Sequence, residues 1–429
     1  MSKNNVVLLG GSNSMMKNGI KSGLEQDNVH LTNLALGASG SLQNLYELKL
    51  PRNQKAIMEA DTIITESNIN DIGNLNAYAK LKLEVVIASI AYLYNELSKL
   101  NKKVLVLILP LYDKSYSDIE TINNAHRYWA KKHGFNVIDM HGFYEEKNVM
   151  DFYMQGDKLH QINPIMKTLG QNIASYLDLL KGQKNTNITE TQKMYFTILS
   201  PKDMEGGEEL EVNEIKNSVF CEKAFKIDKD IELKFKEQYY NTFLVGIHTW
   251  NNEKTDIGGD FIASKMRIKT KDSCIIKGSP NGRIFHTINP ILIDSQVTIS
   301  LANKNTQMTE GSEWLNTKPK KILDYCNLVD FFVVSCEKLE YESFLKEDIK
   351  IEKEYDFNFL IPDVVFIKEA IEEYCGGIAG SISYYLLLIK LGEAVLKAPK
   401  RWYKGGYLWL WYKVYQIKKK YAKELKERE

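Results

Sequence analysis

Residues 1–181 alternate short apolar runs with longer stretches of helical spacing, and this alternation constrains the fold of the chain most strongly. Each run is brief, rich in branched apolar residues and bounded by turn residues, which is typical of buried strands. The expected strands are Val6–Leu9, Val29–Leu36, Thr62–Thr65, Val104–Leu109 and Asn136–Ile138. The expected helices between and after them are Ser14–Glu25, Leu42–Glu47, Tyr78–Leu100, Ile119–His133 and Pro164–Leu180. This order predicts an α/β domain with a parallel sheet and helices on both faces.

The remaining residues have a different pattern, as expected for a chain of 429 residues, which is too long for one ordinary core. Residues 182–193 are polar and lack aromatic anchors, so they are predicted to be a linker. Residues 194–356 contain short runs of period two separated by Gly, Asn, Asp and Pro, which predicts a β-rich accessory domain, an antiparallel sandwich or barrel. Residues 357–429 are predicted to form a helical extension.

The C-terminal extension is rich in aromatic and basic residues. Its apolar stretch, Gly376–Ile389, is shorter than the roughly 20 residues that a membrane-spanning helix needs. The segment 397–413 combines aromatic rings with Lys and Arg, a composition suited to peripheral contact with the inner face of a membrane. Packing of Trp402, Trp409 and Trp411 on the β-rich domain or on a second subunit is an equal alternative.

Composition excludes several classes of partner and cofactor. Fifty-six basic residues against fifty-five acidic ones give a net charge of +1, so no whole-protein field favours nucleic acid. The five cysteines lack zinc-type spacing, which favours buried, reduced thiols in a cytoplasmic protein and predicts no metal. The N-terminus has no signal-peptide pattern. No phosphate-binding loop of a cofactor is visible, so no cofactor is expected.

Four short segments follow the expected strands, or precede the last helix, in places where chemistry is possible. They are Gly10-Gly11-Ser12, the small residues around Gly40, the Asn68-Ile-Asn70-Asp71 segment, and Asp157-Lys-Leu-His160. Glycines let a substrate approach the backbone, and the helix expected after the Ser12 turn aims N–H groups at a developing anion. A carboxylate three residues before a histidine can hold its Nδ1 proton and leave Nε2 free to accept a serine proton.

In this order, the four segments resemble the four sequence blocks of the SGNH/GDSL hydrolase family, over about residues 1–181. The resemblance implies a flavodoxin-like parallel sheet with Ser12 as nucleophile, His160 as proton carrier and Asp157 as the group that orients His160. It also implies that the Ser12 N–H, the Gly40 N–H and the Asn70 amide hold the oxyanion. Asn68 is the alternative to Asn70, which is favoured because Asp71 follows it as in the family pattern. Two blocks depart from the family, since Gly11 replaces its usual Asp and Asn68 its usual Gly, which predicts a divergent branch.

Acyl transfer is the chemistry expected of such a site. The leading hypothesis is a serine esterase or O-acyltransferase acting on acyl esters, such as acetyl esters, of a saccharide in cell-surface polysaccharide assembly. The alternatives are a lipid or thioester hydrolase, and an inactive glycan-binding or scaffold protein. A structural role is expected for four further histidines, His30, His126, His133 and His141. His248 and His286 are expected in the core or on the surface of the β-rich domain, with a sugar-binding face as the alternative.

Overall fold

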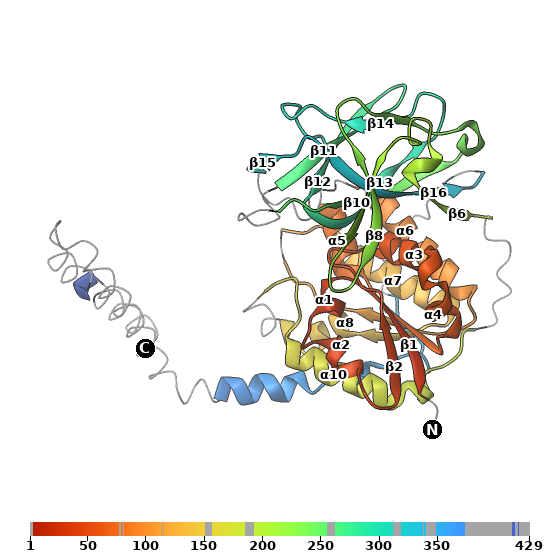
Figure 1. The fold of residues 1–429 in the computed structure, drawn as a ribbon. Helices are drawn as coiled ribbons and strands as arrows, with labels where there is room; N and C mark the ends of the chain where they lie inside the picture. The colour runs from red at the N-terminus through yellow and green to blue at the C-terminus, as the bar shows by residue number, and fades with distance from the viewer. Residues whose placement is uncertain are drawn as a thin grey trace. The chain divides into compact units, whose positions relative to one another are not determined.

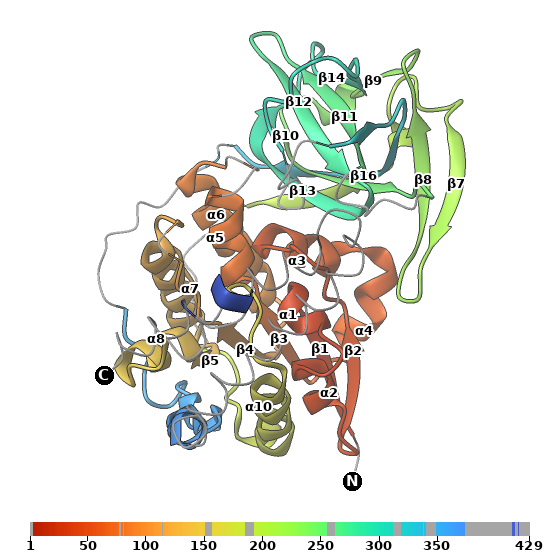
Figure 2. The same ribbon diagram turned by 90° about the vertical axis from the view of Figure 1, so that its left-hand side faces the viewer.

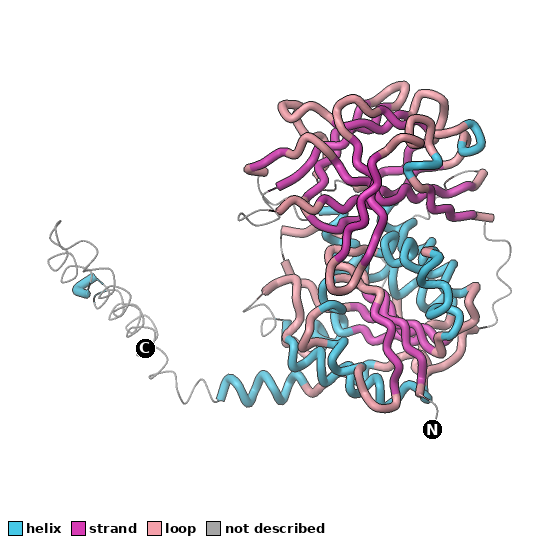
Figure 3. Tube along the Cα trace, viewed as in Figure 1, coloured by secondary structure: helices cyan, strands magenta, loops and turns pink. Residues whose placement is uncertain are grey.

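The structure is a computed structural model that describes residues 3–76, 79, 81–113, 115–150, 157–184, 193–254, 262–311, 319–337, 339, 349–373, 414–416 and 419. It divides into two compact units, Met1–Pro362 and Asp363–Glu429. The first unit contains a helix-rich α/β domain and a β-rich domain, which Figure 3 distinguishes by the cyan helices of one and the magenta strands of the other. Residues 364–373 of the second unit are helical.

The α/β domain is built on a five-stranded parallel sheet in the order β2-β1-β3-β4-β5. Its strands are β1 Asn4–Leu9, β2 Val29–Asn33, β3 Thr62–Glu66, β4 Lys103–Ile108 and β5 Asn136–Asp139. This is the strand order of flavodoxin-like folds, in which the carboxyl ends of β1 and β3 meet at the point where the order reverses. The predicted fold class is confirmed.

Helices cover both faces of this sheet (Figure 1). One group is α2 Ile20–Leu24 with α10 Asn163–Tyr176, and the other is α3 Ser41–Lys49, α6 Leu83–Ser98 and α7 Ile119–His133 in series. Shorter helices are α1 Ser12–Met15, α4 Gln54–Glu59, α5 Asn68–Asn76 and α8 Met140–Glu146. The expected helix Ser14–Glu25 is therefore two helices, with Gly19 capping the second, and α4, α5 and α8 were not predicted.

The β-rich domain consists of two mainly antiparallel sheets that enclose one apolar core. One sheet has the order β13-β10-β16-β8-β7, with β6 paired to β16, and the other has the order β12-β11-β14-β9, with β15 paired to β11. The strands are β6 Tyr195–Leu199, β7 Glu211–Lys216, β8 Cys221–Ile227, β9 Glu232–Lys234, β10 Phe243–Asn251, β11 Ile262–Lys269, β12 Cys274–Pro280, β13 Gly282–Leu292, β14 Thr298–Leu301, β15 Lys321–Ile322 and β16 Cys326–Ser335.

After the β-rich domain the chain returns to the α/β sheet. Residue 356 pairs in parallel with Val137 of β5, through hydrogen bonds from Val137 N–H to Tyr355 and from Phe357 N–H to Val137. Asn172 of α10 donates to the Leu360 carbonyl at 2.8 Å. The predicted boundary at 356/357 thus falls inside a segment that extends the edge of the parallel sheet.

Some of the segments named in the sequence analysis are described by the structure, and others are not. Residues 185–192 of the predicted linker, the apolar stretch Gly376–Ile389 and the segment 397–413 lie outside the described residues. Within the described part of the chain, no helix is long and apolar enough to cross a membrane. The four described cysteines are free, but Cys221 and Cys274 lie exposed at strand ends, so the expectation of buried thiols is wrong for these two.

Candidate active site

Ser12 is the first residue of a helix that begins directly after β1. Gly10 and Gly11 form the turn, and Ser14 N–H closes it with a hydrogen bond of 3.1 Å to the Gly11 carbonyl. Neighbouring side chains crowd both glycines, since a Cβ on Gly10 would lie 2.4 Å from Ser14 Oγ and one on Gly11 would lie 2.0 Å from Asn70 Nδ2. Glycine is needed here for close approach, and it leaves the Ser12 hydroxyl at the carboxyl end of β1.

His160 bridges Ser12 and Asp157. Its Nε2 lies 2.8 Å from Ser12 Oγ and its Nδ1 lies 2.6 Å from Asp157 Oδ2. In the neutral imidazole only one ring nitrogen carries a proton, and a carboxylate can only accept, so the proton belongs on Nδ1 and Nε2 accepts from the serine hydroxyl. Partial burial opposes ionisation of Asp157, but hydrogen bonds from His160 and the Leu159 N–H outweigh it and lower its pKa.

Asn13 fixes the segment that carries His160, a role that the sequence analysis missed. Its side-chain amide donates to the Leu159 carbonyl at 3.0 Å, and its Oδ1 accepts from the Gln161 N–H at 2.9 Å. These two bonds join residues almost 150 positions apart in the sequence and flank His160 on both sides. Asn13, the residue after Ser12, therefore sets the distance between Ser12 and His160.

Gly40 and Asn70 lie on the helices next to the Ser12 turn. Gly40 caps α3, and Ala38 before it has a left-handed φ of 56°, a conformation that costs a residue with a Cβ on the order of 1 kcal/mol. Asp71 holds this turn, because its carboxylate accepts hydrogen bonds from the Ser41 N–H at 2.8 Å and the Ser41 hydroxyl at 2.7 Å. The structure thus brings the second and third sequence blocks into direct contact.

The two asparagines of the third block have different surroundings. Asn68 is fully buried and satisfied, with its amide donating to the Leu109 carbonyl and to Asn123 and its Oδ1 accepting from the Leu109 N–H. Asn70 Nδ2 is buried against Gly11 and has no hydrogen-bond partner among the described residues. A buried donor without a partner costs roughly 1–3 kcal/mol, so its retention beside Ser12 favours Asn70 as the oxyanion donor.

A buried glutamate lies behind the Ser12 turn. Glu66, the last residue of β3, accepts hydrogen bonds from the Gly11 N–H and the Ser14 hydroxyl, both at 3.1 Å, while its other oxygen has no partner in the described chain. Burial raises the pKa of Glu66 to about 7, and the two hydrogen bonds act in the opposite direction. An acidic residue at the end of an apolar strand was the available sequence signal.

Glu120, His141 and Glu145 are the described residues whose donor atoms lie close enough to hold a metal ion together. However, His141 Nδ1 accepts a hydrogen bond from the Leu111 N–H at 3.3 Å, so its proton belongs on Nε2, the atom that faces both carboxylates. Histidines that bind metals keep a proton on the nitrogen away from the metal. This cluster is therefore suited to hydrogen bonding between His141 and the carboxylates rather than to a metal.

Among the described residues, none of the other histidines is hydrogen-bonded to Ser12, but His126 Nε2 lies 3.2 Å from Asp71 Oδ2. His126, His133 and His141 are buried, whereas His30 is exposed on β2. His248 and His286 are fully buried, and burial lowers the pKa of both well below the usual value. Neither lines an open face, so the alternative of a sugar-binding surface at these two residues is wrong.

Three solved structures illustrate what the α/β domain is similar to. They are a lipase/acylhydrolase from Enterococcus faecalis (17% identity, 43% of this chain, 100% of that chain, TM-score 0.33), an acetyl-xylooligosaccharide esterase from Geobacillus Stearmophilus (14%, 41%, 93%, 0.33) and a psychrotrophic esterase from Pseudoalteromonas sp. (15%, 41%, 100%, 0.30). No family model and no curated protein matches the sequence.

The strand order and the positions of the four blocks at the ends of β1, β2, β3 and before α10 decide the fold class of this domain. It has an SGNH hydrolase-like fold. In this SGNH-like domain the serine, the aspartate–histidine pair and the asparagine come from separate blocks, and the Ser12 turn brings all of them together.

Proposed function

We propose that the chain is an acyl ester hydrolase with Ser12 as nucleophile, His160 as general base and Asp157 as the residue that orients His160. The proposal depends on one observation, the continuous hydrogen-bonded path from Ser12 through His160 to Asp157. Ser12 Oγ attacks the acyl carbon while its proton moves to His160 Nε2. The His160 proton then passes to the leaving alkoxide, and a water or a second hydroxyl, activated in the same way, releases the acyl group.

The Ser12 N–H, the Gly40 N–H and the Asn70 amide are proposed to hold the oxyanion. The unpartnered Asn70 Nδ2 supports this role, since it is available to a ligand at no cost in internal hydrogen bonds. Removing one such donor typically costs on the order of 3 kcal/mol of transition-state stabilisation.

For the substrate, we propose an O-acyl ester of a saccharide, with hydrolysis or transfer of the acyl group decided by the acceptor. The openness of the triad supports this choice, because Asp157 is 59% exposed and the adjacent Lys158 pairs with Asp113 at 3.2 Å in solvent. A polar, open rim accommodates a bulky hydrophilic alcohol. Three parts of this proposal depend on the sequence alone. They are a role in cell-surface polysaccharide assembly, a cytoplasmic location and peripheral membrane contact through residues 397–413.

A lipid or thioester hydrolase is a second candidate because of the apolar side chains beside the triad. Met15 follows Ser12 by three residues, Leu159 precedes His160, Ile162 follows it, and all three are more than a third exposed. Tyr112, next to Asp113, is exposed as well. Together these side chains could hold an acyl chain.

The test is turnover of p-nitrophenyl esters of two to twelve carbons and of acetylated oligosaccharides by wild type and S12A, together with labelling by a fluorophosphonate. Loss of turnover and labelling in S12A supports a serine hydrolase. Preference for acetyl esters supports the saccharide substrate, and preference for long chains supports the lipid candidate. If the wild-type protein neither hydrolyses any of these esters nor becomes labelled, the proposed function is wrong. The hypothesis to test next is then an inactive glycan-binding protein.

A further inference from the structure

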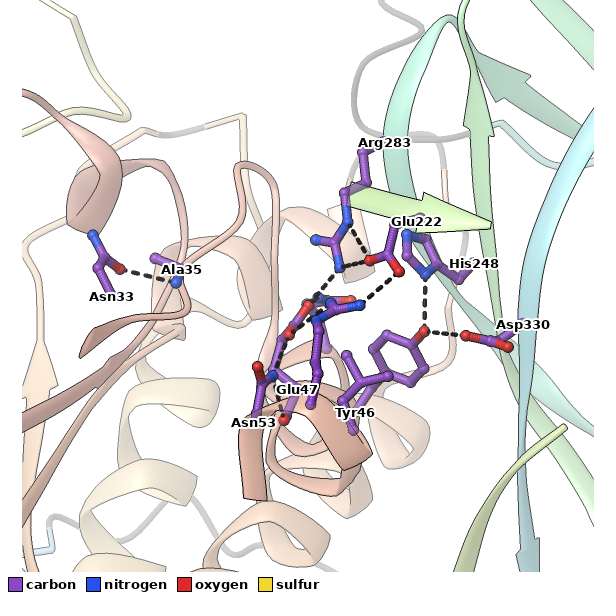
Figure 4. Close-up of polar contacts among 12 residues, drawn as sticks. Asn33, Ala35, Tyr46, Glu47, Asn53, Glu222, His248, Arg283 and Asp330 are labelled. Atoms are coloured by element: carbon purple, nitrogen blue, oxygen red, sulfur yellow. Dashed lines mark hydrogen bonds and ion pairs between the residues drawn. The ribbon is translucent and has the colours of Figure 1, made fainter. Parts of the chain in front are cut away.

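The α/β domain and the β-rich domain meet in a buried ionic network. Arg283 of β13 donates to Glu47 Oε1 at 2.8 Å and to Glu222 Oε1 of β8 at 3.0 Å, and Arg52 donates to Glu222 Oε2 at 2.6 Å (Figure 4). Glu47 and Arg283 have side chains that are only 1% and 2% exposed. Two acids and two bases, one of each from each domain, therefore neutralise one another across the boundary.

Tyr46, the residue directly before Glu47, makes a second connection between the two domains. Its hydroxyl donates to Asp330 Oδ2 at 2.8 Å and lies 2.9 Å from His248 Nδ1, and both partners belong to the β-rich domain. Its ring packs against Phe285 and Phe332, with centroids 4.8 Å and 5.6 Å away. Figure 4 shows the Tyr46 side chain pointing from its helix toward His248 and Asp330 of the β-rich domain.

Tyr46 and Glu47 both belong to α3, the helix that begins at the Ser12 site. Glu47 lies seven positions after Gly40, which corresponds to about 10 Å along a helix axis. At the first turn of α3, Ser41 is bonded to Asp71, the neighbour of Asn70. At its last turn, the β-rich domain holds the helix. Figures 1 and 2, which are related by a 90° turn, both show α3 between α1, the helix that begins at Ser12, and the β-rich domain.

We infer that the β-rich domain is a positioning element of the active site, acting through Arg283 and Tyr46 on helix α3 and thereby on the Gly40 N–H. This inference rests on the proposed function for its kinetic consequences. Misplacement of a reacting or stabilising group by about 1 Å can cost on the order of 100-fold in rate. Loss of Arg283 removes one of the two guanidinium groups that neutralise Glu47 and Glu222 and leaves Arg52 to pair with both acids, at 3.4 Å and 2.6 Å. Because Glu47 and Glu222 are buried, this loss of positive charge favours movement of α3.

The experiment compares R283M with R283K, Y46F and a matched control, K277M. Lys277 is also a buried basic residue of the β-rich domain, but it pairs with Glu310 of the same domain at 3.3 Å. We expect R283M and Y46F to lower kcat for p-nitrophenyl acetate by roughly 10- to 100-fold with KM nearly unchanged. R283K should restore part of the activity, and K277M should keep the kcat of wild type.

Hydrogen exchange gives a readout that does not depend on activity. We expect the amides of residues 41–49 to exchange faster in R283M and Y46F, while K277M keeps the wild-type rate. A folded R283M or Y46F protein that keeps both the kcat and the exchange rates of wild type would overturn the inference. If R283M does not fold, the result for Y46F alone tests the inference. Inactive wild type with faster exchange in these variants overturns the proposed function but leaves the positioning role of the β-rich domain intact.

Discussion

The side-chain amide of Asn70 occupies the space that a side chain on Gly11 would need, because a Cβ at position 11 would lie 2.0 Å from Asn70 Nδ2. The glycine at position 11, where the family usually has Asp, and the position of Asn70, the proposed oxyanion donor, are therefore linked in this chain. Gly11 has an ordinary extended φ of −90°, so a side chain at this position would strain no backbone but would displace the Asn70 amide.

The first prediction is that G11A lowers activity by displacing the Asn70 amide. We expect kcat for p-nitrophenyl acetate to fall by about 10²- to 10³-fold, the range for loss of one oxyanion donor. G11D, which restores the residue usual in the family, should be at least as damaging. G182A is the control, since nothing lies within 4 Å of a Cβ at Gly182. Wild-type kcat in G11A would show that Asn70 does not act from its present position.

The second prediction separates the two asparagines of the third block by their effects. N70A should lower kcat by roughly 10²-fold or more and change the free energy of unfolding little, because Asn70 Nδ2 has no partner to lose among the described residues. N68A should instead lower the free energy of unfolding by about 2–3 kcal/mol, because it removes three buried hydrogen bonds. Urea unfolding and steady-state kinetics of both variants measure the two effects. The reverse assignment of effects would exchange the roles of Asn68 and Asn70.

The sequence predicts the parallel sheet well because each strand is a short apolar run between turns. It does not predict α5, whose sequence Asn-Ile-Asn-Asp-Ile-Gly-Asn-Leu-Asn has four asparagines and a glycine, all poor helix formers. Tertiary contacts stabilise this helix, with Asn68 and Asp71 each bonded to other segments. The helix matters for the site because it fixes which asparagine side chain lies against Gly11.

The role of Asn13 and the contact between the domains could not be predicted from periodicity. Asn13 reaches a segment almost 150 residues away, and no local pattern encodes its partner. No local pattern distinguishes Glu47 and Arg52 from charges that face solvent, but the β-rich domain pairs them with Arg283 and Glu222. Charged residues become buried here only because each finds an opposite charge from the other domain.

The third prediction concerns Asp157. D157N should keep the fold, since this side chain is more than half exposed, but it should weaken the hold on the His160 Nδ1 proton. In a buried triad the same change costs on the order of 10⁴-fold in kcat, and the exposure of Asp157 leads us to expect a smaller loss, about 10²-fold. Steady-state kinetics measure it, with D113N as the control because Asp113 pairs with Lys158 and not with the histidine. Wild-type kcat in D157N would remove Asp157 from the mechanism.

The fourth prediction is that two buried carboxyl groups make stability depend on pH. Burial raises the pKa of both Glu66 and Asp330 to about 7. Between the unfolded pKa near 4 and the folded pKa near 7, the unfolded chain ionises while the folded protein keeps its protons. Each group therefore stabilises the folded state below about pH 4, and this contribution is lost as pH rises through 7. At about 1.4 kcal/mol per pKa unit, a pKa raised by about three units corresponds to a full loss of roughly 4 kcal/mol for each group.

Buried histidines act in the opposite direction, so the wild-type pH profile alone cannot isolate these carboxyls. Burial lowers the pKa of His133 to about 4, which makes its contribution increase with pH between about 4 and 6.5. The test is therefore the difference in free energy of unfolding between each variant, E66Q or D330N, and wild type, measured by urea unfolding at pH 4.5 and pH 8. We expect this difference to shift in favour of the variant by up to about 3 kcal/mol at the higher pH. E352Q is the exposed control and should show little shift; an equal difference at both pH values for E66Q and D330N would show that these carboxyls titrate normally.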